Sequence, residues 1–487
     1  MHLLNEWRNR SRYEKFLLCL FFMTLPLVNP WVRGDGVGYY AYGRALLIEG
    51  RLDFERDWLE ANPSFRTGRV DAQNHIVAGQ YTRTGHLDNH FTIGPSILWF
   101  PFLLTAHLVV KVCDALGAHI AADGFSRPYT FAMAFGTVLY GFLGLWLSFQ
   151  IAKRFFAERW AFLGTLGIWF ASSLPVYMYF NPSWSHAHSA FIDALFVWYW
   201  LRTLGRRTTL EWVFLGLIGG LMMDVYYPNA FLLLLPLVES LRAYWHKLRI
   251  APPRTTDLPG LLAANALFCF ALLLAFLPTL ISRWVIYGSI FASGYVPMRE
   301  WYWTSPFLGS VLFSSDHGLF SWTPIVALAC LGLILLAGHD RWLSANLLLV
   351  FVAFYYFISS YPSWDGISSF GNRFFVSLTP LFVIGLASFF DWLARALPVK
   401  RVSAVAIGAT ALLSAWNFGL IFQWGTHLIP ARGPISWREA AYNQVSAVPT
   451  EAFRTLKGYL TRRSELMHRI EQEDVKQLKS GQAEGRQ

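Results

Sequence analysis

The chain has 487 residues, of which 55% are hydrophobic and 14% are charged. Soluble domains carry about 25% charged residues, so this composition excludes an ordinary soluble protein. The sequence has no series of short segments with alternating polarity, which a membrane barrel would require. We therefore predict an all-α, polytopic membrane protein. The four cysteines lie in or beside apolar runs and indicate neither a disulfide framework nor a zinc site.

Apolar runs recur along the chain, and each can cross a bilayer as a helix of roughly 17 to 25 residues. The first, residues 16–32, lacks a small-residue cleavage site, and we interpret it as a retained helix. The basic residues before it place the N-terminus in the cytoplasm: Arg8, Arg10, Arg12 and Lys15. The further expected spans are residues 128–150, 160–180, 187–201, 212–224, 229–241, 260–286, 321–337, 343–360, 374–392 and 402–424. The spans 212–224 and 229–241 are short and predict a tight helical hairpin.

Directly after the first run comes Arg33-Gly34-Asp35-Gly36-Val37-Gly38-Tyr39-Tyr40, which opens a polar loop of about residues 33–90. Glycines let the backbone turn and approach a ligand closely, and a carboxylate just outside the bilayer can act as a base. The alternative is a Gly-Asp turn that caps a helix end. Residues 39–49 predict a short helix that lies on the membrane surface, with Tyr42, Leu46 and Leu47 on one face.

The basic residues of the later loops indicate topology rather than nucleic-acid binding, although the formal charge is +10. They form four groups: Lys153, Arg154 and Arg159; Arg202, Arg206 and Arg207; Arg242, Lys247, Arg249 and Arg254; and Arg395, Lys400 and Arg401. All four face the cytoplasm only if residue 127 lies outside, together with Asp35. Segment 91–112, which Gly94-Pro95 and Pro101 interrupt, should then return to its own side rather than cross. This topology predicts about eleven to twelve crossings, with the C-terminal tail outside.

In this topology nearly all polar candidates for function lie at the outer face. His186 and His188 do not share a helix face, so we favour hydrogen bonding over a metal site. Asp316 and His317 can position a substrate, or Asp316 can belong to an ordinary helix cap. Asp365 follows a tryptophan, as acids in carbohydrate sites often do, although tryptophan is also enriched at membrane interfaces. We divide the chain into a membrane domain, residues 1–424, and a polar tail, residues 425–487, in which we expect residues 450–476 to form a solvated helix.

Several short motifs resemble those of the GT-C superfamily of membrane glycosyltransferases, especially its bacterial members similar to the dolichyl- or polyprenyl-phosphate-mannose protein mannosyltransferases. The resemblance covers the organisation of roughly residues 10–424. The motifs that carry it are Gly34 to Tyr40, Asn89-His90-Phe91-Thr92-Ile93-Gly94-Pro95, Trp99-Phe100-Pro101-Phe102, Phe313 to Pro324, and Phe370-Gly371-Asn372-Arg373-Phe374-Phe375 with Pro380.

The resemblance implies an inverting transferase that uses a polyprenyl-phosphate sugar and in which Asp35 is the general base. A cation must meet the donor phosphate, and Arg373 is the first choice, because a guanidinium binds phosphate in a bidentate manner. Arg373 at a helix end can alternatively anchor in the lipid headgroups. The other expected substrate-binding residues are His90, Arg299, Tyr39, Tyr40, Asp316, His317 and Asp365. Some relatives have a basic residue where this chain has Asp224.

We therefore expect a glycosyltransferase of a bacterial inner membrane, with its active site on the outer face. Its partners would be the lipid-linked donor, a glycan, lipid or protein acceptor, and membrane lipid. We expect no nucleic acid and no cofactor; a divalent metal is compatible with the sequence but not indicated by it. One alternative is a transporter or flippase of a lipid-linked saccharide, for which Asp193 and Asp224 are the interior acids. Another is an assembly subunit without chemistry. The sequence identifies neither the sugar nor the acceptor.

Overall fold

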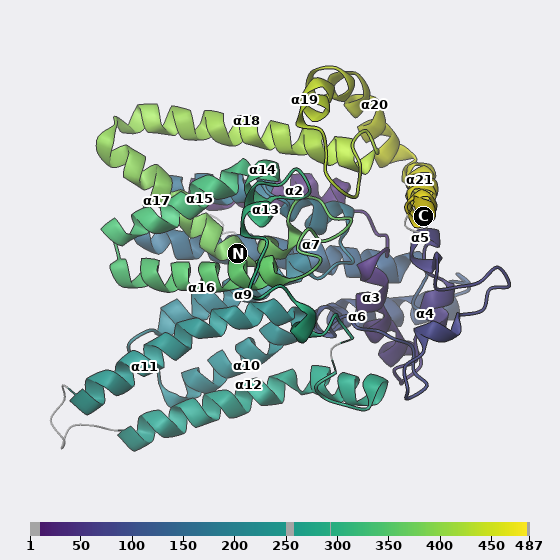
Figure 1. Ribbon diagram of the computed structural model, residues 1–487, viewed down its shortest axis with the longest axis horizontal. Coiled ribbons are helices and arrows are strands. Elements are labelled where there is room, and N and C mark those ends of the chain that lie inside the picture. Colours follow the sequence, from purple (N-terminus) through teal and green to yellow (C-terminus); the bar gives the residue numbers. More distant parts are fainter. Residues whose placement is uncertain (1–9, 250–257, 293, 485–487) are drawn as a thin grey trace.

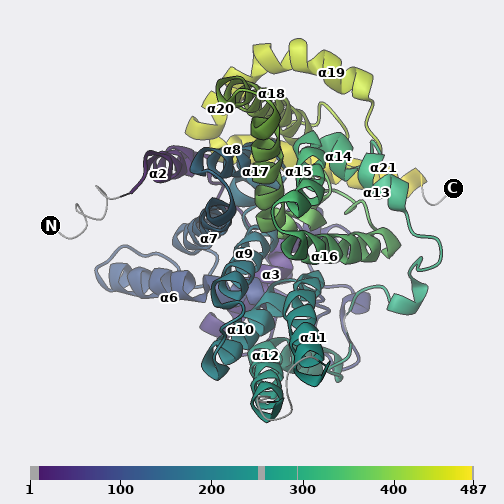
Figure 2. The same cartoon turned by 90° about the vertical axis from the view of Figure 1, so that its left-hand side faces the viewer.

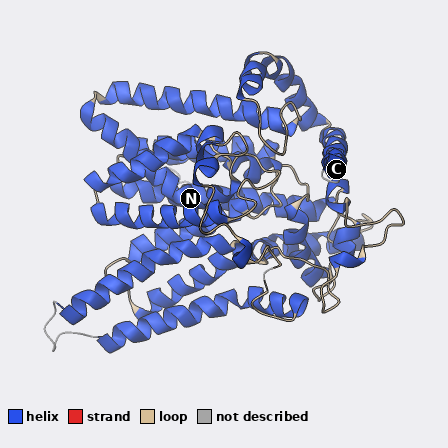
Figure 3. Cartoon of the chain, viewed as in Figure 1, coloured by secondary structure: helices blue, strands red, loops and turns tan. Residues whose placement is uncertain are grey.

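The computed structural model describes residues 10–249, 258–292 and 294–484, and these residues form helices and loops (Figures 1 and 3). Within this described part, β-structure is limited to two isolated bridges in the first long loop, Val70–Ile76 and Tyr81–Leu87. The predicted all-α fold class is therefore confirmed.

Six segments of the described chain are long and apolar enough to cross a membrane. They are α6 Gly94–Ala115, α7 Arg127–Phe155, α12 Leu258–Tyr287, α16 Arg341–Ser360, η7 with α17 over Arg373–Ala396, and α18 Val399–Gly425. The other predicted spans correspond to shorter helices: α2 Arg12–Thr24, α8 Glu158–Ala171, α9 His186–Thr203, α10 Thr209–Val225, α11 Leu234–Arg249 and α15 Pro324–Leu335. The protein is thus a multi-helix membrane protein whose helices differ widely in length.

The first helix differs from its predicted bounds of residues 16–32. It begins earlier, at Arg12, because the side chains of Ser11 and Glu14 form a capping box with the backbone. It also ends earlier, since Pro26 lies in a short 3-10 turn that follows Thr24. With 13 residues, α2 is about 20 Å long, which is less than the thickness of a bilayer core.

Segment 91–112 forms one continuous helix, α6, although it contains Pro101, so the expected bend was wrong, whereas the expectation that this segment does not cross the membrane stays a prediction. The helix pairs with the N-terminal part of α7: Tyr140 Oη donates to the carbonyl of Leu98 at 3.1 Å, and His107 Nδ1 lies 2.6 Å from Tyr129 Oη. Antiparallel pairing of this kind directs α6 away from the C-terminal end of α7. Consequently α6 does not approach the end of the bundle where Lys153 lies.

The predicted tight hairpin of residues 212–241 was also wrong. A 3-10 segment, η4 Tyr227–Leu233, joins α10 to α11, but α10 packs along α12. An added Cβ at Gly216 or Gly220 would meet the carbonyl oxygen of Phe268 or Leu272 within 2.4 Å, so these glycines permit the close approach. Figure 2 shows α10, α11 and α12 on one side of the bundle and α18 with the tail helix α19 Trp437–Val445 on the opposite side.

The four basic groups lie together at one end of the bundle. His339 and Trp342, two residues around the start of α16, contact the four segments that carry these basic groups. The contacts are Phe156–His339 at 5.5 Å between ring centroids, Arg395–His339 at 3.3 Å, Trp200–Trp342 at 5.5 Å between ring centroids, and Arg242 over the Trp342 ring at 5.8 Å. This end is therefore the basic end of the bundle; Arg8 and Arg254 lie outside the described residues.

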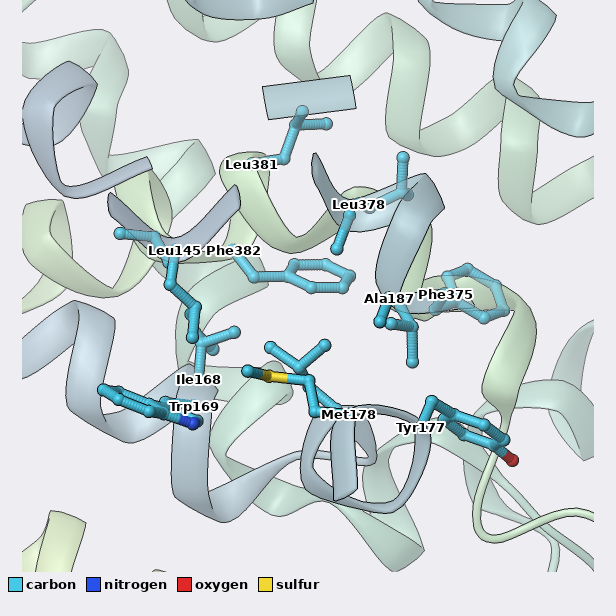
Figure 4. Close-up of a cluster of buried hydrophobic side chains, with 14 of the residues drawn as sticks. Leu145, Ile168, Trp169, Tyr177, Met178, Ala187, Phe375, Leu378, Leu381 and Phe382 are labelled. Atoms are coloured by element: carbon cyan, nitrogen blue, oxygen red, sulfur yellow. The ribbon is translucent and has the colours of Figure 1, made fainter. Parts of the chain in front are cut away.

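The opposite end holds Asp35, and a dense aromatic and aliphatic core supports it (Figure 4). Met178 and Tyr177, in the π-helical turn η3 Val176–Phe180, pack among side chains of α7, α8, α9 and η7. This core fixes η3 and, with it, the short loop of residues 181–185 that contacts the Asp35 segment. Cores of this density tolerate little displacement, so the packing sets the position of that loop.

Candidate functional site

Asp35 is the first residue of helix α3 Asp35–Ile48, which the sequence predicted to start at residue 39 and to lie on the membrane surface. Instead α3 is buried from Gly36 to Ala45, and its first turn begins at the acid. Gly34 has a φ of +54°, which favours glycine. An added Cβ at Gly36 would lie 1.9 Å from Ser183 Oγ, and one at Gly38 would lie 2.0 Å from the Phe91 ring. The glycines of the motif therefore serve close packing, and Asp35 sits at a helix N-terminus, where a negative charge is favourable.

Asp35 and Arg373, two predicted site residues 338 positions apart, form an ion pair. Arg373 Nη2 lies 3.0 Å from Asp35 Oδ2, and their side chains are 12% and 33% exposed. The guanidinium also lies over the Trp184 ring at 4.4 Å, and Trp184 Nε1 donates to the carbonyl of Arg33 at 3.0 Å. Three separate segments thus converge on the carboxylate and hold it in place.

A cavity of about 620 Å³ opens at Asp35. Its polar lining includes Arg33, Arg69, Arg432, His427 and Asp474, whereas Arg373 is not among the described residues that line it. The apolar lining comes from three helices: Phe418, Ile421 and Phe422 of α18, Phe453, Leu456 and Tyr459 of α20 Ala447–Thr461, and Leu466, Met467 and Ile470 of α21 Arg463–Glu484. The cavity therefore combines a charged floor with apolar walls, which suits an anionic head on an apolar chain.

The tail was expected to be a solvated helix, and this was wrong, whereas the expectation that it has no catalytic role stays a prediction. The tail forms α19, α20 and α21, and α21 packs beside the first long loop (Figure 1). Glu471 Oε1 accepts hydrogen bonds from Asn62 Nδ2 at 2.7 Å and from the backbone amide of Ser64 at 2.6 Å. The charged composition of α21 concealed the narrow apolar face that lines the cavity.

Asp474 of α21 connects the tail to the Asp35 segment. Its carboxylate forms an ion pair with Arg33 and accepts a hydrogen bond from His427 Nε2 at 2.9 Å. Burial by itself would raise the pKa of Asp474, but the hydrogen bond from His427 and the charge of Arg33 hold that pKa below its ordinary value. Asp474 is therefore an ionised carboxylate in the same cavity as Asp35.

A second cavity of about 340 Å³ shares Phe65, Thr67, Arg69 and Phe91 with the first and adds His90 to its lining. The His90 ring packs on the rings of Phe91 and Tyr295, at 4.2 and 4.9 Å between centroids. Burial lowers the pKa of His90, which favours the neutral imidazole. His90 therefore faces the smaller cavity, across Arg69 and Phe91 from the larger one.

The remaining predicted site residues lie outside the lining of both cavities. Tyr39 and Tyr40 are buried in the core, where burial raises the pKa of each phenol, and Tyr40 Oη donates to the carbonyl of Gly124 at 2.6 Å. Arg299 has an 83% exposed side chain that pairs only loosely with Glu300, at 3.7 Å. Their expected part in substrate binding has no support from their position.

Asp316, His317 and Asp365 form a cluster whose candidate ligand atoms lie within 4.8 Å of one another, so they can hold a metal ion. His317 Nδ1 is 3.0 Å from the carbonyl of Asp365, while Asp316 Oδ1 and His317 Nε2 are buried without a hydrogen-bond partner. Burial and the charge of Asp365 raise the pKa of Asp316 to about 6, and burial lowers the pKa of His317 to about 4. Gly366 directly follows Asp365 in the loop that leads to Arg373, and a Cβ added at Gly366 would lie 3.3 Å from Arg373 Nε. The cluster therefore lies next to the Asp35–Arg373 pair.

Several functional candidates were missed from the sequence. Arg33 and Arg69 line the cavity beside Asp35, and both lie in the segment of residues 33–90, of which only Asp35, Tyr39, Tyr40 and His90 were considered as site residues. Arg283 of α12 donates to the carbonyls of Asn89, His90 and Phe91 at 3.1, 2.8 and 2.7 Å. Arg283 is a lone arginine within an apolar run, so the sequence alone could have indicated that its side chain binds polar groups.

The interior residues considered as alternatives are all buried. Asp193 is fully buried on α9, and Asp224 Oδ1 accepts from the backbone amide of Thr279 at 3.3 Å. His186 packs against Tyr177, whereas His188 packs against Trp99. The two histidines therefore belong to different aromatic clusters.

Comparison with known proteins gives no family assignment. No family model and no curated protein matches the chain. Among solved structures it is similar to the oligosaccharyltransferase of Archaeoglobus fulgidus in the apo form, with 15% identity over 91% of this chain and 55% of that one and a TM-score of 0.44. The complex of that enzyme with Zn and sulfate gives 14% identity over 82% and 52% and a TM-score of 0.43.

A third similar structure is the archaeal oligosaccharyltransferase AglB from Archaeoglobus fulgidus in complex with an inhibitory peptide and a dolichol-phosphate. It gives 12% identity over 90% of this chain and 55% of that one, with a TM-score of 0.42. The chain thus spans about half the length of the solved chains it matches. Likeness at this level does not establish an activity or a substrate for this chain.

Proposed function

We propose that the protein is a membrane glycosyltransferase of the GT-C type that transfers a sugar from a polyprenyl-phosphate donor to an acceptor hydroxyl. The observation that carries this proposal is the position of Asp35, on the charged floor of a cavity with apolar walls. Burial of an isoprenoid chain against such walls is favourable, at roughly 25 cal/mol for each Å² of apolar surface removed from water. The arginines of the floor supply charge for the phosphate.

The chemistry assigned to Asp35 is that of a general base. The acceptor oxygen attacks the anomeric carbon while its proton passes to the Asp35 carboxylate. The bond between that carbon and the phosphate oxygen breaks, and its electron pair stays with the polyprenyl phosphate that leaves. Attack from the face opposite the phosphate inverts the anomeric centre. The Arg373 pair and the α3 N-terminus orient the carboxylate.

The second cavity supports a separate path for the acceptor. It meets the larger cavity at Arg69, Phe65 and Phe91, so donor and acceptor can approach Asp35 from different directions. We further propose that the basic end faces the cytoplasm and the Asp35 end faces outward from a bacterial inner membrane, since the four basic groups gather at the other end. The sugar and the acceptor are not part of the proposal.

The decisive experiment measures the transfer of labelled sugars from a panel of polyprenyl-phosphate donors in proteoliposomes. Wild type is compared with Asp35→Asn, which keeps the shape of the side chain but cannot accept the proton. We expect transfer to fall by about 100-fold or more, the size typical of a lost general base. The matched control is Asp53→Asn, since Asp53 is an exposed loop acid paired with the exposed Arg51, and its transfer should stay at the wild-type level.

Equal transfer by Asp35→Asn and wild type would refute the assignment of the base. If neither protein consumes a donor but a lipid-linked sugar moves between the leaflets, the protein is a transporter. The buried Asp193 and Asp224 would then be the first residues to change.

A further inference from the structure

The charges around the larger cavity do not balance, and this imbalance identifies where an anion binds. Asp35 is paired with Arg373, and Asp474 is paired with Arg33. Arg69 and Arg432 also line the cavity, and neither forms an ion pair within the described ranges of the chain. Three arginines therefore line the cavity together with two carboxylates, and Asp35, one of these carboxylates, is already paired with Arg373 outside the lining, which favours an anionic ligand.

Arg33 is held at a fixed place relative to Asp35. Its backbone carbonyl accepts from Trp184 Nε1 at 3.0 Å, and its amide lies 3.4 Å from Ser183 Oγ. Its guanidinium lies over the Trp31 ring at 4.8 Å. A cation two residues before the proposed base and facing the same cavity is well placed to meet the anionic part of a ligand whose reacting carbon lies at Asp35.

The Asp474 carboxylate offers acceptor oxygens to Arg33, as the phosphate of a lipid ligand would. One carboxylate oxygen, Oδ2, binds Arg33, and the other, Oδ1, binds His427. A lipid phosphate likewise offers several acceptor oxygens to neighbouring donors. We propose that Asp474 is an internal competitor of the lipid phosphate for Arg33 and His427, so that the ligand's anionic head must displace this carboxylate when it binds.

The same helix supplies the wall against which the lipid chain would lie. Met467, Ile470 and Asp474 follow one another at intervals of three and four residues, so they share one face of α21, and all three line the cavity. The contacts of Glu471 with Asn62 and Ser64 are independent of Asp474. They keep α21 docked when the Asp474 carboxylate is displaced, so the competition affects the anion subsite rather than the fold. That the ligand is a polyprenyl phosphate rests on the proposed function.

The test uses the whole chain in detergent and farnesyl phosphate as the probe. Binding is followed by the change in intrinsic tryptophan fluorescence, to which Trp184 and Trp424 contribute because they line the cavity. Asp474→Asn should bind farnesyl phosphate about three- to tenfold more tightly than wild type, because a half-buried ion pair of this kind contributes a modest free energy. Glu473→Gln is the matched control. Its carboxylate is on the adjacent residue, is 40% exposed and pairs with Lys476, so its affinity should equal that of wild type.

A double-mutant cycle assigns the effect to Arg33. In the Arg33→Gln background the substitution Asp474→Asn should give a clearly smaller gain, because one of the two groups for which the carboxylate competes is gone and only His427 remains. A gain of equal size in both backgrounds would overturn the proposal, as would unchanged or weaker binding by Asp474→Asn, which would make Asp474 a tail anchor only. If Asp474→Asn does not fold, Asp474→Ser serves for the same comparison.

Two further probes identify the ligand class. Farnesol lacks the anion and inorganic phosphate lacks the chain, so each should bind wild type at least tenfold more weakly than farnesyl phosphate. Equal binding of farnesol would reject the anion subsite. These measurements need no sugar transfer, so they remain valid if Asp35→Asn disproves the transferase. Conversely, an active transferase in which Asp474→Asn leaves the affinity unchanged would disprove only the competition.

Discussion

Helix α3 carries one member of each of two Asp–Arg pairs, one at its first residue and one in its C-terminal half, and the pairs differ in exposure and geometry. At the N-terminal end, Asp35 makes a single contact of 3.0 Å with Arg373, its side chain is one-third exposed, and it faces a cavity. Nine residues along, Arg44 binds both oxygens of Asp57 at 2.7 and 2.5 Å, and the two side chains are 0% and 2% exposed. Glu49 also binds Arg44, at 2.7 Å.

This difference separates a pair that holds structure from a pair that can do chemistry. The guanidinium of Arg44 has its donors occupied, and no solvent or ligand can reach Asp57. Asp35 keeps one carboxylate oxygen outside its ion pair and has access to a large cavity. A proton acceptor needs that access, so accessibility rather than the residue type distinguishes the two aspartates.

The largest expected effect is a loss of stability when the buried Arg44–Asp57 pair is broken. Arg44→Met leaves the Asp57 carboxylate buried without its partner, which should lower the free energy of unfolding by about 3–5 kcal/mol. Unfolding of the purified protein in mixed detergent micelles measures this loss. The control is Arg51→Gln, which breaks the exposed pair of Arg51 with Asp53 and should change the stability by less than about 1 kcal/mol. A stable Arg44→Met protein would contradict a structural role for this pair.

A second substitution tests why the Asp35 segment is rich in glycine. Gly36→Ala places a methyl group 1.9 Å from Ser183 Oγ, and such overpacking typically costs about 1–3 kcal/mol. It should also displace Asp35 and slow sugar transfer. Adding Ser183→Gly removes the nearest side-chain atoms and should restore part of the stability. Gly79→Ala, at a glycine with no atom within 4 Å of an added Cβ, is the control and should behave as wild type.

The smallest effect concerns the counterion of Asp35. Arg373→Gln keeps a planar polar group near Trp184 but removes the charge that orients the carboxylate. We expect sugar transfer to fall by about tenfold, which corresponds to about 1.4 kcal/mol and is less than the loss for Asp35→Asn. Arg395→Gln, at the basic end of the bundle, should transfer sugar normally. If Arg373→Gln lost as much as Asp35→Asn, Arg373 would act on the reacting groups directly, as a phosphate ligand.

The sequence predicted most helices, because long apolar runs have few alternatives to a helix in a membrane. It misplaced the elements whose burial depends on distant partners. Helix α3 was expected at the membrane surface, but its Gly-rich face packs against Ser183 and Phe91. The tail was expected to be solvated because its charged residues conceal Met467 and Ile470. Asp35 and Arg373 were both singled out, yet their ion pair could not be foreseen from residues so far apart in the chain.

By itself the sequence therefore determined the helical class, the gathering of basic residues between apolar runs, and the identity of Asp35 as a carboxylate after the first helix. These properties follow from local composition, since hydrophobic length and charge act on short segments. Only the tertiary structure decided which aspartate is accessible, that Arg373 is its counterion rather than part of the cavity lining, and that α21 completes the cavity with Asp474 on Arg33. Such relations depend on packing between segments hundreds of residues apart, and no local pattern encodes them.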